Sequence, residues 1–330
     1  MAPSNPSAAT GLLNQRSDKP LETHIHLASE KGLSSITTLI VGPASNTAVI
    51  IDPPFLNEDA ESFVRFVHEK APGCEVLAAF STHWHPDHYW AVDVLLKAFP
   101  KASFFAAPYV CEGIDREYEE KCKFWPGVYG DAVHPRPTKP KPYPYSFFIV
   151  PGHSNSPVVL LGPVQGDCAD HSMFWLPREK TVITGDCVYG RSTHVWVEEI
   201  ETPTLLEAWK NILDLIDGME IEKIIPGHLE SGWELDRDAD MAHNRKYLDL
   251  FATKIAYAEK KATKDDIYQT FEKAFPDCKA NLGFFLGMLS NTHGSDGKVW
   301  EENRHHNVGA RTPAGLEGFV IGNDVKLKEK

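Results

Sequence analysis

Apolar and polar positions along the first eighty residues switch from strand-like to helix-like spacing and back. Stretches that alternate or run apolar between turn signals predict an antiparallel meander. Its strands are expected at residues 23–27, 35–41 and 47–51. Asn57 is expected to cap a helix, because Phe63, Val64 and Val67 behind it recur at helical spacing. The apolar run at 75–82 then predicts a buried strand.

The middle of the chain repeats this mixture. A helix is expected at 89–99 and a short strand at 103–106, but the proline-rich stretch 121–145 excludes a central strand and predicts a rigid, extended loop. A helix follows at 203–217, where Pro203 suits the first turn. Further strands are expected at 147–150, 158–164, 173–176, 181–184 and 223–225. Two β-rich halves interleaved with helices predict an α/β (α+β) fold, a four-layered αββα sandwich.

The pattern changes after about residue 233, where only helical spacing remains. We therefore divide the chain into a flexible N-terminal tail (1–20), a layered domain (21–232) and a C-terminal helical extension (233–330) that packs on the domain. An apolar stripe near residues 282–289 favours packing against this domain, with a subunit interface of a homodimer as the second choice.

Composition narrows the classes of partner. A net charge of −13 leaves no basic surplus for nucleic-acid phosphates or an acidic lipid surface. No apolar run approaches the ~18 residues of a membrane span, and the first residues lack the pattern of a secretory signal. The 6 cysteines show no paired spacing, which is typical of reduced thiols in the cytoplasm. We expect a cytoplasmic protein that acts on a small molecule.

The stretch His83-Trp84-His85-Pro86-Asp87-His88 directly follows the buried strand expected at 75–82. His83 and His85 leave the strand end on one side, and Asp87 and His88 point across the same hollow from the following turn. Three imidazoles and a carboxylate in this spacing suit two metal ions better than one. Such ligands are typical of zinc, with iron and manganese as competitors.

Read from Thr82, this T-H-x-H-x-D-H string resembles the signature of the metallo-β-lactamase-fold hydrolases. The resemblance covers roughly residues 20–232. It implies a bridging carboxylate in a later Gly-Asp and a further ligand in a Gly-His. Gly185-Asp186 and Gly227-His228 supply both in the right order, each after a β-branched run.

The family's other histidine ligand is missing in its usual form. Asp167 stands 19 positions before Asp186, where family spacing places that ligand, and a carboxylate binds borderline metals well. Gln165 and His171 are the alternatives, whereas we interpret His153 as a turn residue. The resemblance thus implies two Zn²⁺ per chain, one held by His83, His85 and Asp167 and one by Asp87, His88 and His228, with Asp186 between them. The carboxylate at position 167 shifts the preference toward iron or manganese.

The chemistry implied is hydrolysis, in which a metal-bound hydroxide attacks the carbonyl of a small cyclic amide or ester, a lactam or lactone. Asp87 is expected to carry the proton, and Tyr189 or His194 to donate a hydrogen bond to the developing oxyanion. Aromatic residues around the motif favour a compact, flat substrate of the kind that detoxifying enzymes open. The alternatives are a thioesterase of glyoxalase II type, a single-iron oxygenase and a non-catalytic binding module.

Overall fold

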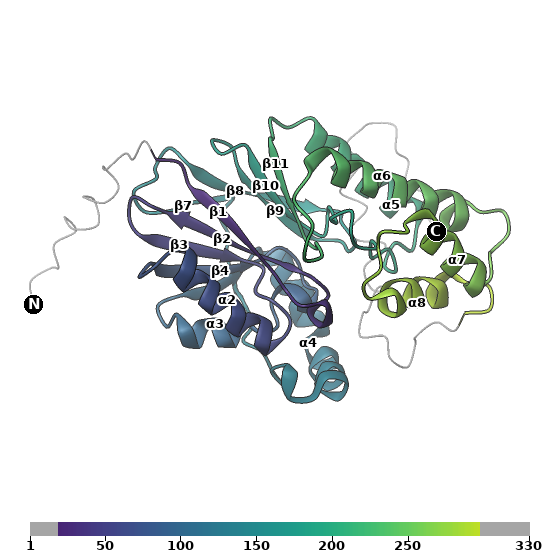
Figure 1. Ribbon diagram of the computed structural model, residues 1–330, viewed down its shortest axis with the longest axis horizontal. Helices are drawn as coiled ribbons and strands as arrows, with labels where there is room; N and C mark the ends of the chain where they lie inside the picture. Colours follow the sequence, from purple (N-terminus) through teal and green to yellow (C-terminus); the bar gives the residue numbers. More distant parts are fainter. Residues whose placement is uncertain (1–18, 298–330) are drawn as a thin grey trace, which may run out of the picture.

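Two β-sheets packed face to face form the centre of the molecule, and the computed structural model describes residues 19–297 (Figure 1). Most of the predicted N-terminal tail and the end of the predicted extension lie outside these residues. None of the helices in the described part of the chain is long and apolar enough to cross a membrane.

The first sheet has the strand order β1-β2-β3-β4-β5-β6. Its strands are β1 (Glu22–Leu27), β2 (Ile36–Gly42), β3 (Thr47–Ile51), β4 (Glu75–Ser81), β5 (Ser103–Ala106) and β6 (Lys141–Pro142). The meander β1-β2-β3 is antiparallel, which confirms the prediction, and β3, β4 and β5 are parallel neighbours. β4 therefore lies inside the sheet, and its carboxyl end delivers the histidine motif.

The second sheet has the order β11-β10-β9-β8-β7. Its strands are β7 (Phe147–Ile149), β8 (Pro157–Val164), β9 (His171–Leu176), β10 (Thr181–Gly185) and β11 (Lys223–Pro226). Only β10 and β11 pair in parallel among these strands. Because parallel strands end at the same edge of a sheet, the loops after β10 and β11 lie close together.

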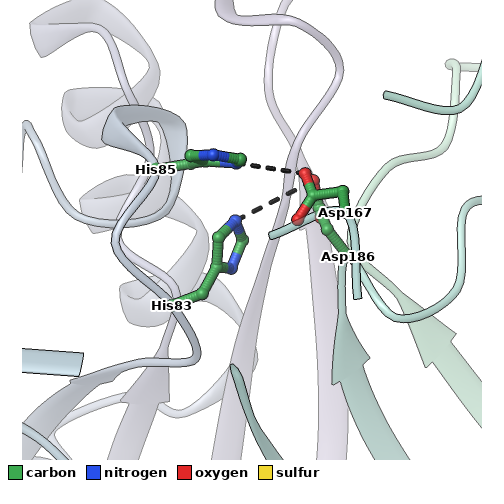
Figure 2. Close-up of side chains that lie close together, drawn as sticks. All are labelled: His83, His85, Asp167 and Asp186. Carbon is green, nitrogen blue, oxygen red and sulfur yellow. Dashed lines mark ion pairs between the residues drawn. The ribbon is translucent and has the colours of Figure 1, made fainter. Parts of the chain in front are cut away.

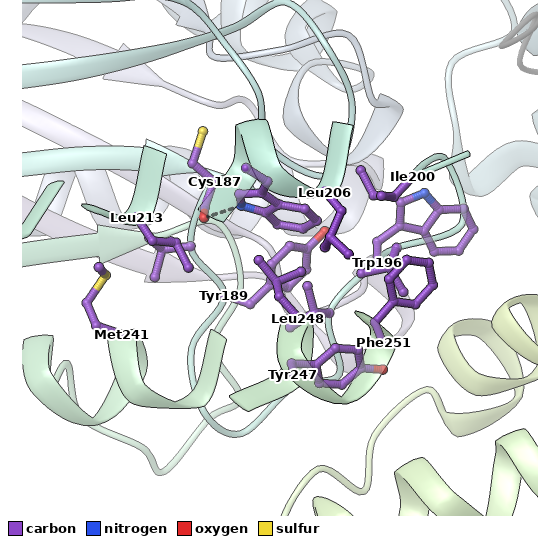
Figure 3. Packing of buried hydrophobic residues seen from close by; sticks show 14 of the residues in the cluster. Cys187, Tyr189, Trp196, Ile200, Leu206, Leu213, Met241, Tyr247, Leu248 and Phe251 are labelled. Atoms are coloured by element: carbon purple, nitrogen blue, oxygen red, sulfur yellow. Dashed lines mark hydrogen bonds between the residues drawn. The ribbon is translucent and has the colours of Figure 1, made fainter. Parts of the chain in front are cut away.

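Three hydrophobic clusters fill the spaces between the layers. Between the sheets, Phe80 of β4 meets Phe174 of β9 with ring centroids 5.5 Å apart. The outer face of the first sheet packs on α2 (Asn57–Lys70), α3 (Val92–Ala98) and α4 (Pro108–Tyr129). The outer face of the second packs on α5 (Pro203–Asp217) and α6 (Arg237–Phe251). Figure 3 shows side chains of these two helices packed with residues of the segment that follows β10. Helices thus cover both outer faces, and the αββα prediction is confirmed (Figure 1).

The regular elements that follow β11 in the described part of the chain are all helices. A π-helical segment (Ala252–Ala256) continues α6, and α7 (Lys264–Ala274) and α8 (Leu282–His293) follow. Single turns of 3₁₀-helix connect other elements at Glu30–Gly32, Pro86–His88 and Gly130–Ala132. Apolar residues of α7 and α8 belong to the same cluster as those of α5 and α6, so the last helices share one core with the second sheet.

Two sequence predictions about helices are wrong. The loop predicted for 121–145 begins only after Tyr129, because α4 continues through Pro126. A proline late in a helix removes one backbone donor, and α4 ends within a turn of it. Asn57 is not the cap of α2: it is the first helical residue, Leu56 precedes it without a capping bond, and the Asn57 amide donates to the carbonyl of Asp131.

Candidate metal centre

All candidate ligands lie on loops at one edge of the two sheets. His83 and His85 follow β4, and the 3₁₀ turn Pro86–His88 carries the next two candidates. Asp186 directly follows β10, and His228 follows β11 within two residues. Asp167 lies in the connection between β8 and β9. The edge at which β4, β10 and β11 end therefore gathers side chains from both sheets.

The donor atoms of the seven predicted ligands form two adjacent groups, within each of which they lie no more than 4.8 Å apart. The first group contains His83, His85, Asp167 and Asp186, and Figure 2 shows its imidazoles pointing at the two carboxylates. His85 Nδ1 lies 3.0 Å from Asp167 Oδ2, and His83 Nε2 lies 3.9 Å from Asp186 Oδ2. All four residues are buried.

The second group contains Asp87, His88 and His228. His228 Nε2 lies 3.4 Å from Asp87 Oδ2, and His88 Nε2 lies 3.6 Å from the same oxygen. Asp186 reaches this group as well, because its Oδ1 lies 3.2 Å from His88 Nε2 and its Oδ2 lies 3.0 Å from His228 Nε2. One carboxylate is thus shared between the two groups.

Hydrogen bonds behind the ligands fix which ring nitrogen of each histidine faces the centre. Asp52, at the end of β3, accepts from His88 Nδ1 at 3.1 Å and from the Thr82 hydroxyl at 2.9 Å. Because the Thr82 hydroxyl donates its one proton to Asp52, it accepts a hydrogen bond from His83 Nδ1, which lies 2.9 Å away. In their neutral forms both histidines therefore turn an unprotonated Nε2 toward the centre.

The other two histidines are held in the same way. His228 Nδ1 lies 2.8 Å from the carbonyl oxygen of Leu33, and His85 Nε2 lies 2.8 Å from Glu199 Oε1. His228 then presents Nε2 and His85 presents Nδ1. A carboxylate or carbonyl behind each imidazole is the usual support of a metal-bound histidine. The donors present, and the buried His83 Nε2 that makes no hydrogen bond, fit a pair of borderline divalent cations.

Gly227 is required by this packing. A Cβ at position 227 would collide with Asp186 Oδ1, so only glycine lets β11 end against the shared carboxylate. The Gly-His pair therefore brings the ligand loop and the carboxylate together.

Three residues were candidates for the third ligand of the first group. Of these, Asp167 belongs to that group, and Gln165 and His171 do not. Asp167 Oδ2 faces His85, whereas the Gln165 amide donates to the backbone carbonyl of Gly166. His171 Nε2 lies 2.8 Å from Asp167 Oδ1 and thus supports that carboxylate from behind. His153 is occupied by the backbone of Ala44 and Lys19 on both ring nitrogens, as expected for a turn residue.

The two candidate hydrogen-bond donors are placed differently. The Tyr189 hydroxyl lies 2.9 Å from Asp167 Oδ2 and 2.5 Å from Asp186 Oδ2, and its ring stacks on His228 with centroids 5.0 Å apart. His194 does not line the pocket that lies over the two donor groups. Its ring packs against Tyr247 and Phe275 in the core beside α6, which does not support a contact with substrate.

Neighbouring charges shift the pKa values of the buried groups of the centre. Burial alone would lower the pKa of His85, but the charges of Asp167 and Glu199 outweigh it and raise the pKa to about 10. Burial likewise opposes the charged forms of Asp186 and His88. The charge of Asp186 nevertheless raises the pKa of His88 strongly. In turn, His228 and His88 hold the pKa of Asp186 well below its usual range. Cations bound here would displace protons, so we expect their binding to weaken in acid.

Sequence reasoning missed Asp52 and Glu199. Asp52 had a signal, because it follows β3 at the same edge as the ligand loops. Glu199 had none, since it lies 114 positions from His85 in a segment without regular structure.

The pocket over the two groups is walled mainly by apolar side chains. Besides five members of the centre it is lined by Tyr189 and by seven apolar residues, and none of these described lining residues is a lysine or an arginine. The apolar members are Leu33, Phe55, Pro86, Trp125, Trp196, Phe284 and Phe285.

Comparisons with known proteins agree with the geometry. The family model described as "Metallo-beta-lactamase superfamily" matches residues 32–228, a range that contains every candidate ligand. No curated protein matches the chain significantly.

Similar solved structures include the metallo-beta-lactamase IND-7 (16% identity, TM-score 0.49, 71% of this chain and 95% of that one). The metallo-beta-lactamase from Pontibacter korlensis is 15% identical with a TM-score of 0.46, and the match covers 71% of this chain and 97% of that one. The sec-alkylsulfatase Pisa1 from Pseudomonas sp. is 13% identical with a TM-score of 0.46, and the match covers 72% of this chain and 40% of that one. Likeness at this level says nothing about substrate.

Proposed function

Because the chain belongs to the metallo-beta-lactamase superfamily, we propose that it is a dinuclear metal-dependent hydrolase that opens a small cyclic amide or ester. The observation that carries the proposal is the pair of adjacent donor groups sharing Asp186, in which each histidine turns one ring nitrogen toward the carboxylates of the centre. Such sharing suits two neighbouring cations better than one.

In this proposal His83, His85 and Asp167 would hold one cation, and Asp87, His88 and His228 would hold the other, since Asp186 lies within reach of both groups. Zinc is the proposed metal, and iron and manganese suit the same donors. When bound, such a pair supplies an ionised water near neutral pH and polarises a carbonyl oxygen.

Side chains of the pocket supply the other parts of the reaction. Asp87 lines the pocket and is slightly exposed, so its second oxygen is placed to take up and return a proton. Tyr189 lines the same pocket, and its hydroxyl donates to Asp167 and Asp186 in this structure. It is proposed to turn this one proton toward the substrate oxygen, where it would stabilise negative charge. The apolar walls exclude bulk water and favour a flat, uncharged substrate.

The test uses purified, metal-loaded protein with lactams, lactones, aryl esters and thioesters. We expect close to two metal ions per chain and hydrolysis of at least one lactam, lactone or ester. Asp87→Asn should reduce kcat by ~10² or more, whereas Asp265→Asn, on the exposed first turn of α7, should leave it unchanged.

Elemental analysis of the same samples separates the competing functions. A single iron per chain, or Asp87→Asn protein as active as wild type with both metals present, would contradict the proposal. Activity confined to thioesters would reassign the substrate class and keep the reaction type.

A further inference from the structure

We infer that helix α8, which lies beyond the residues matched by the family model, forms one wall of the catalytic pocket and that Phe284 determines which substrates fit. The inference rests on the proposed function, because it concerns the substrate of the same site. It assigns to the C-terminal helices a part in recognition that the family match over residues 32–228 does not include.

α8 is attached to the loops of the metal centre at both of its ends and in between. Asn281, which precedes it, donates to the carbonyl oxygen of Glu30 at 2.9 Å. In its first turns the ring of Phe285 meets the ring of the candidate ligand His228 edge-on, with centroids 6.2 Å apart at 89°. Near its end the Thr292 hydroxyl donates to Glu198 Oε1 at 3.0 Å.

These attachments involve the same segments that hold the ligands. Glu30 lies three residues before Leu33, whose carbonyl fixes the tautomer of His228, and Glu198 directly precedes Glu199, which supports His85. A helix fastened at these points has a fixed position relative to both groups of donors. Its side chains are therefore suited to define the shape of a pocket.

Phe284 is the pocket residue of α8 that stays half-buried, whereas its neighbour Phe285 is buried. Its ring stacks on Trp196 with centroids 5.1 Å apart and an interplanar angle of 21°. It packs against the core of the α5–α8 side and also against the core of the α2–α4 side. Phe284 thus closes the pocket between the two halves of the molecule.

The opposite wall is aromatic as well. Phe55 and Trp125 line the pocket and contact each other edge-to-face with centroids 5.1 Å apart. Flat groups entering between this pair and Phe284 would gain offset or edge contacts on both faces. An anionic group would meet aromatic rings and the carboxylates of the centre, with no lysine or arginine among the described lining residues. The substrate class that fits is uncharged and carries an aromatic ring beside the reacting carbonyl.

The experiment compares Phe284→Ala, Phe284→Leu and Phe284→Arg with Phe147→Ala, a matched control on β7 that is 51% exposed. Hydrolysis of phenyl acetate, 4-carboxyphenyl acetate and methyl acetate is followed with metal-loaded protein. Phe284→Ala should raise KM for phenyl acetate about tenfold, through loss of the aromatic contact and its buried area, while kcat and the KM for methyl acetate stay within about twofold. Phe284→Leu should fall between Phe284→Ala and wild type.

Phe284→Arg supplies a gain-of-function readout. It should raise kcat/KM for 4-carboxyphenyl acetate relative to phenyl acetate about tenfold, because a guanidinium then faces the distal carboxylate. Equal effects of Phe284→Ala and Phe147→Ala on phenyl acetate, or wild-type preference for the carboxylated ester, would overturn the inference.

Binding of benzyl alcohol, measured by NMR line broadening, separates this inference from the proposed function. If wild type hydrolyses none of the esters but binds benzyl alcohol in a manner that Phe284→Ala weakens and Phe147→Ala does not, the wall is supported and the proposed reaction fails. If the esters are hydrolysed and benzyl alcohol binds all variants equally, the reaction is supported and the role of Phe284 is refuted.

Discussion

Single residues of the metal centre are oriented before any ligand binds, because each histidine gives one ring nitrogen to a protein acceptor. Asp52 orients two of them, His88 directly and His83 through Thr82. It also accepts from the backbone N–H of Thr82 at 2.7 Å, which fixes the first residue of the motif. A fixed tautomer removes a conformational choice that would otherwise weaken metal binding.

Replacing Asp167 tests the least conventional ligand. Asp167→Ala removes the carboxylate that faces His85 at 3.0 Å, so the variant should retain about one cation per chain after dialysis and lose ~10² or more in kcat. Gln165→Ala is the matched control and should keep both cations, because that amide donates to the backbone carbonyl of Gly166. Elemental analysis measures both. If Asp167→Ala kept two cations and His171→Ala lost one, His171 would be the ligand.

How far the sequence predicted this centre depends on the residue. The H-x-H-x-D-H spacing, Gly185-Asp186 and Gly227-His228 are local patterns after strands, and the structure brings their side chains together. Asp167 was favoured on spacing and ligand chemistry, and its carboxylate lies within the first group. Glu199 and the carbonyl of Leu33 were out of reach, because their contacts join segments distant in the chain. His194 was expected to face the substrate because it is a polar residue shortly after a ligand. Its ring instead packs against Tyr247 and Phe275 in the core.

Among the elements, α4 packs directly on the ligand loop. Its residues Gly113, Glu117 and Lys121 share one helical face that packs on Trp84, the residue between the two histidine ligands. The buried Lys121 ammonium donates to the Trp84 carbonyl at 2.7 Å, pairs with Glu117 at 3.1 Å and lies 4.6 Å from the indole ring centre. The indole N–H in turn donates to Ala169, so Trp84 joins α4 to the loop of Asp167.

Two glycines of α4 provide a matched pair of variants. In Gly113→Ala the new methyl group would lie 2.7 Å from Trp84 Cδ1, so the substitution should destabilise the protein by about 1–3 kcal/mol and weaken metal binding through Trp84. Gly127→Ala meets nothing within 4 Å and should stabilise by up to about 1 kcal/mol, because alanine favours the helix. Urea unfolding of both variants measures the difference. Equal effects of the two substitutions would show that α4 does not press on Trp84.

Hydrophobic periodicity could not reveal this helix face. A buried lysine interrupts the apolar pattern of α4, and prolines near its end favour a loop, so residues 121–129 were misassigned. By contrast, α5 was predicted with its observed bounds, Pro203–Asp217, because a threonine cap, a first-turn proline and a regular apolar stripe agree there. Local consistency of the signals, rather than the length of the helix, decided the outcome.

At the scale of the whole molecule, the metal centre lies across the join between the two sheets. His83, His85, Asp87 and His88 follow β4 of the first sheet, whereas Asp167, Asp186 and His228 lie on loops of the second. Without cations these loops are held by imidazole–carboxylate pairs and by the core between the sheets. Each cation would therefore act as a cross-link between the sheets and would stabilise the folded chain only.

Removal of the metals should therefore lower global stability as well as activity. A cation present at about a thousand times its Kd stabilises the folded state by about 4 kcal/mol if the unfolded chain does not bind it. We expect EDTA to shift the urea midpoint of the metal-loaded protein downward by a corresponding amount, with little change in the slope of the transition. Asp186→Asn is the control: it weakens the one carboxylate that contacts both donor groups, so EDTA should shift its midpoint by less than half as much. Identical midpoints of the wild type with and without EDTA, in samples shown to have bound and lost two cations, would mean that the centre does not link the sheets and that the core between them carries the stability alone.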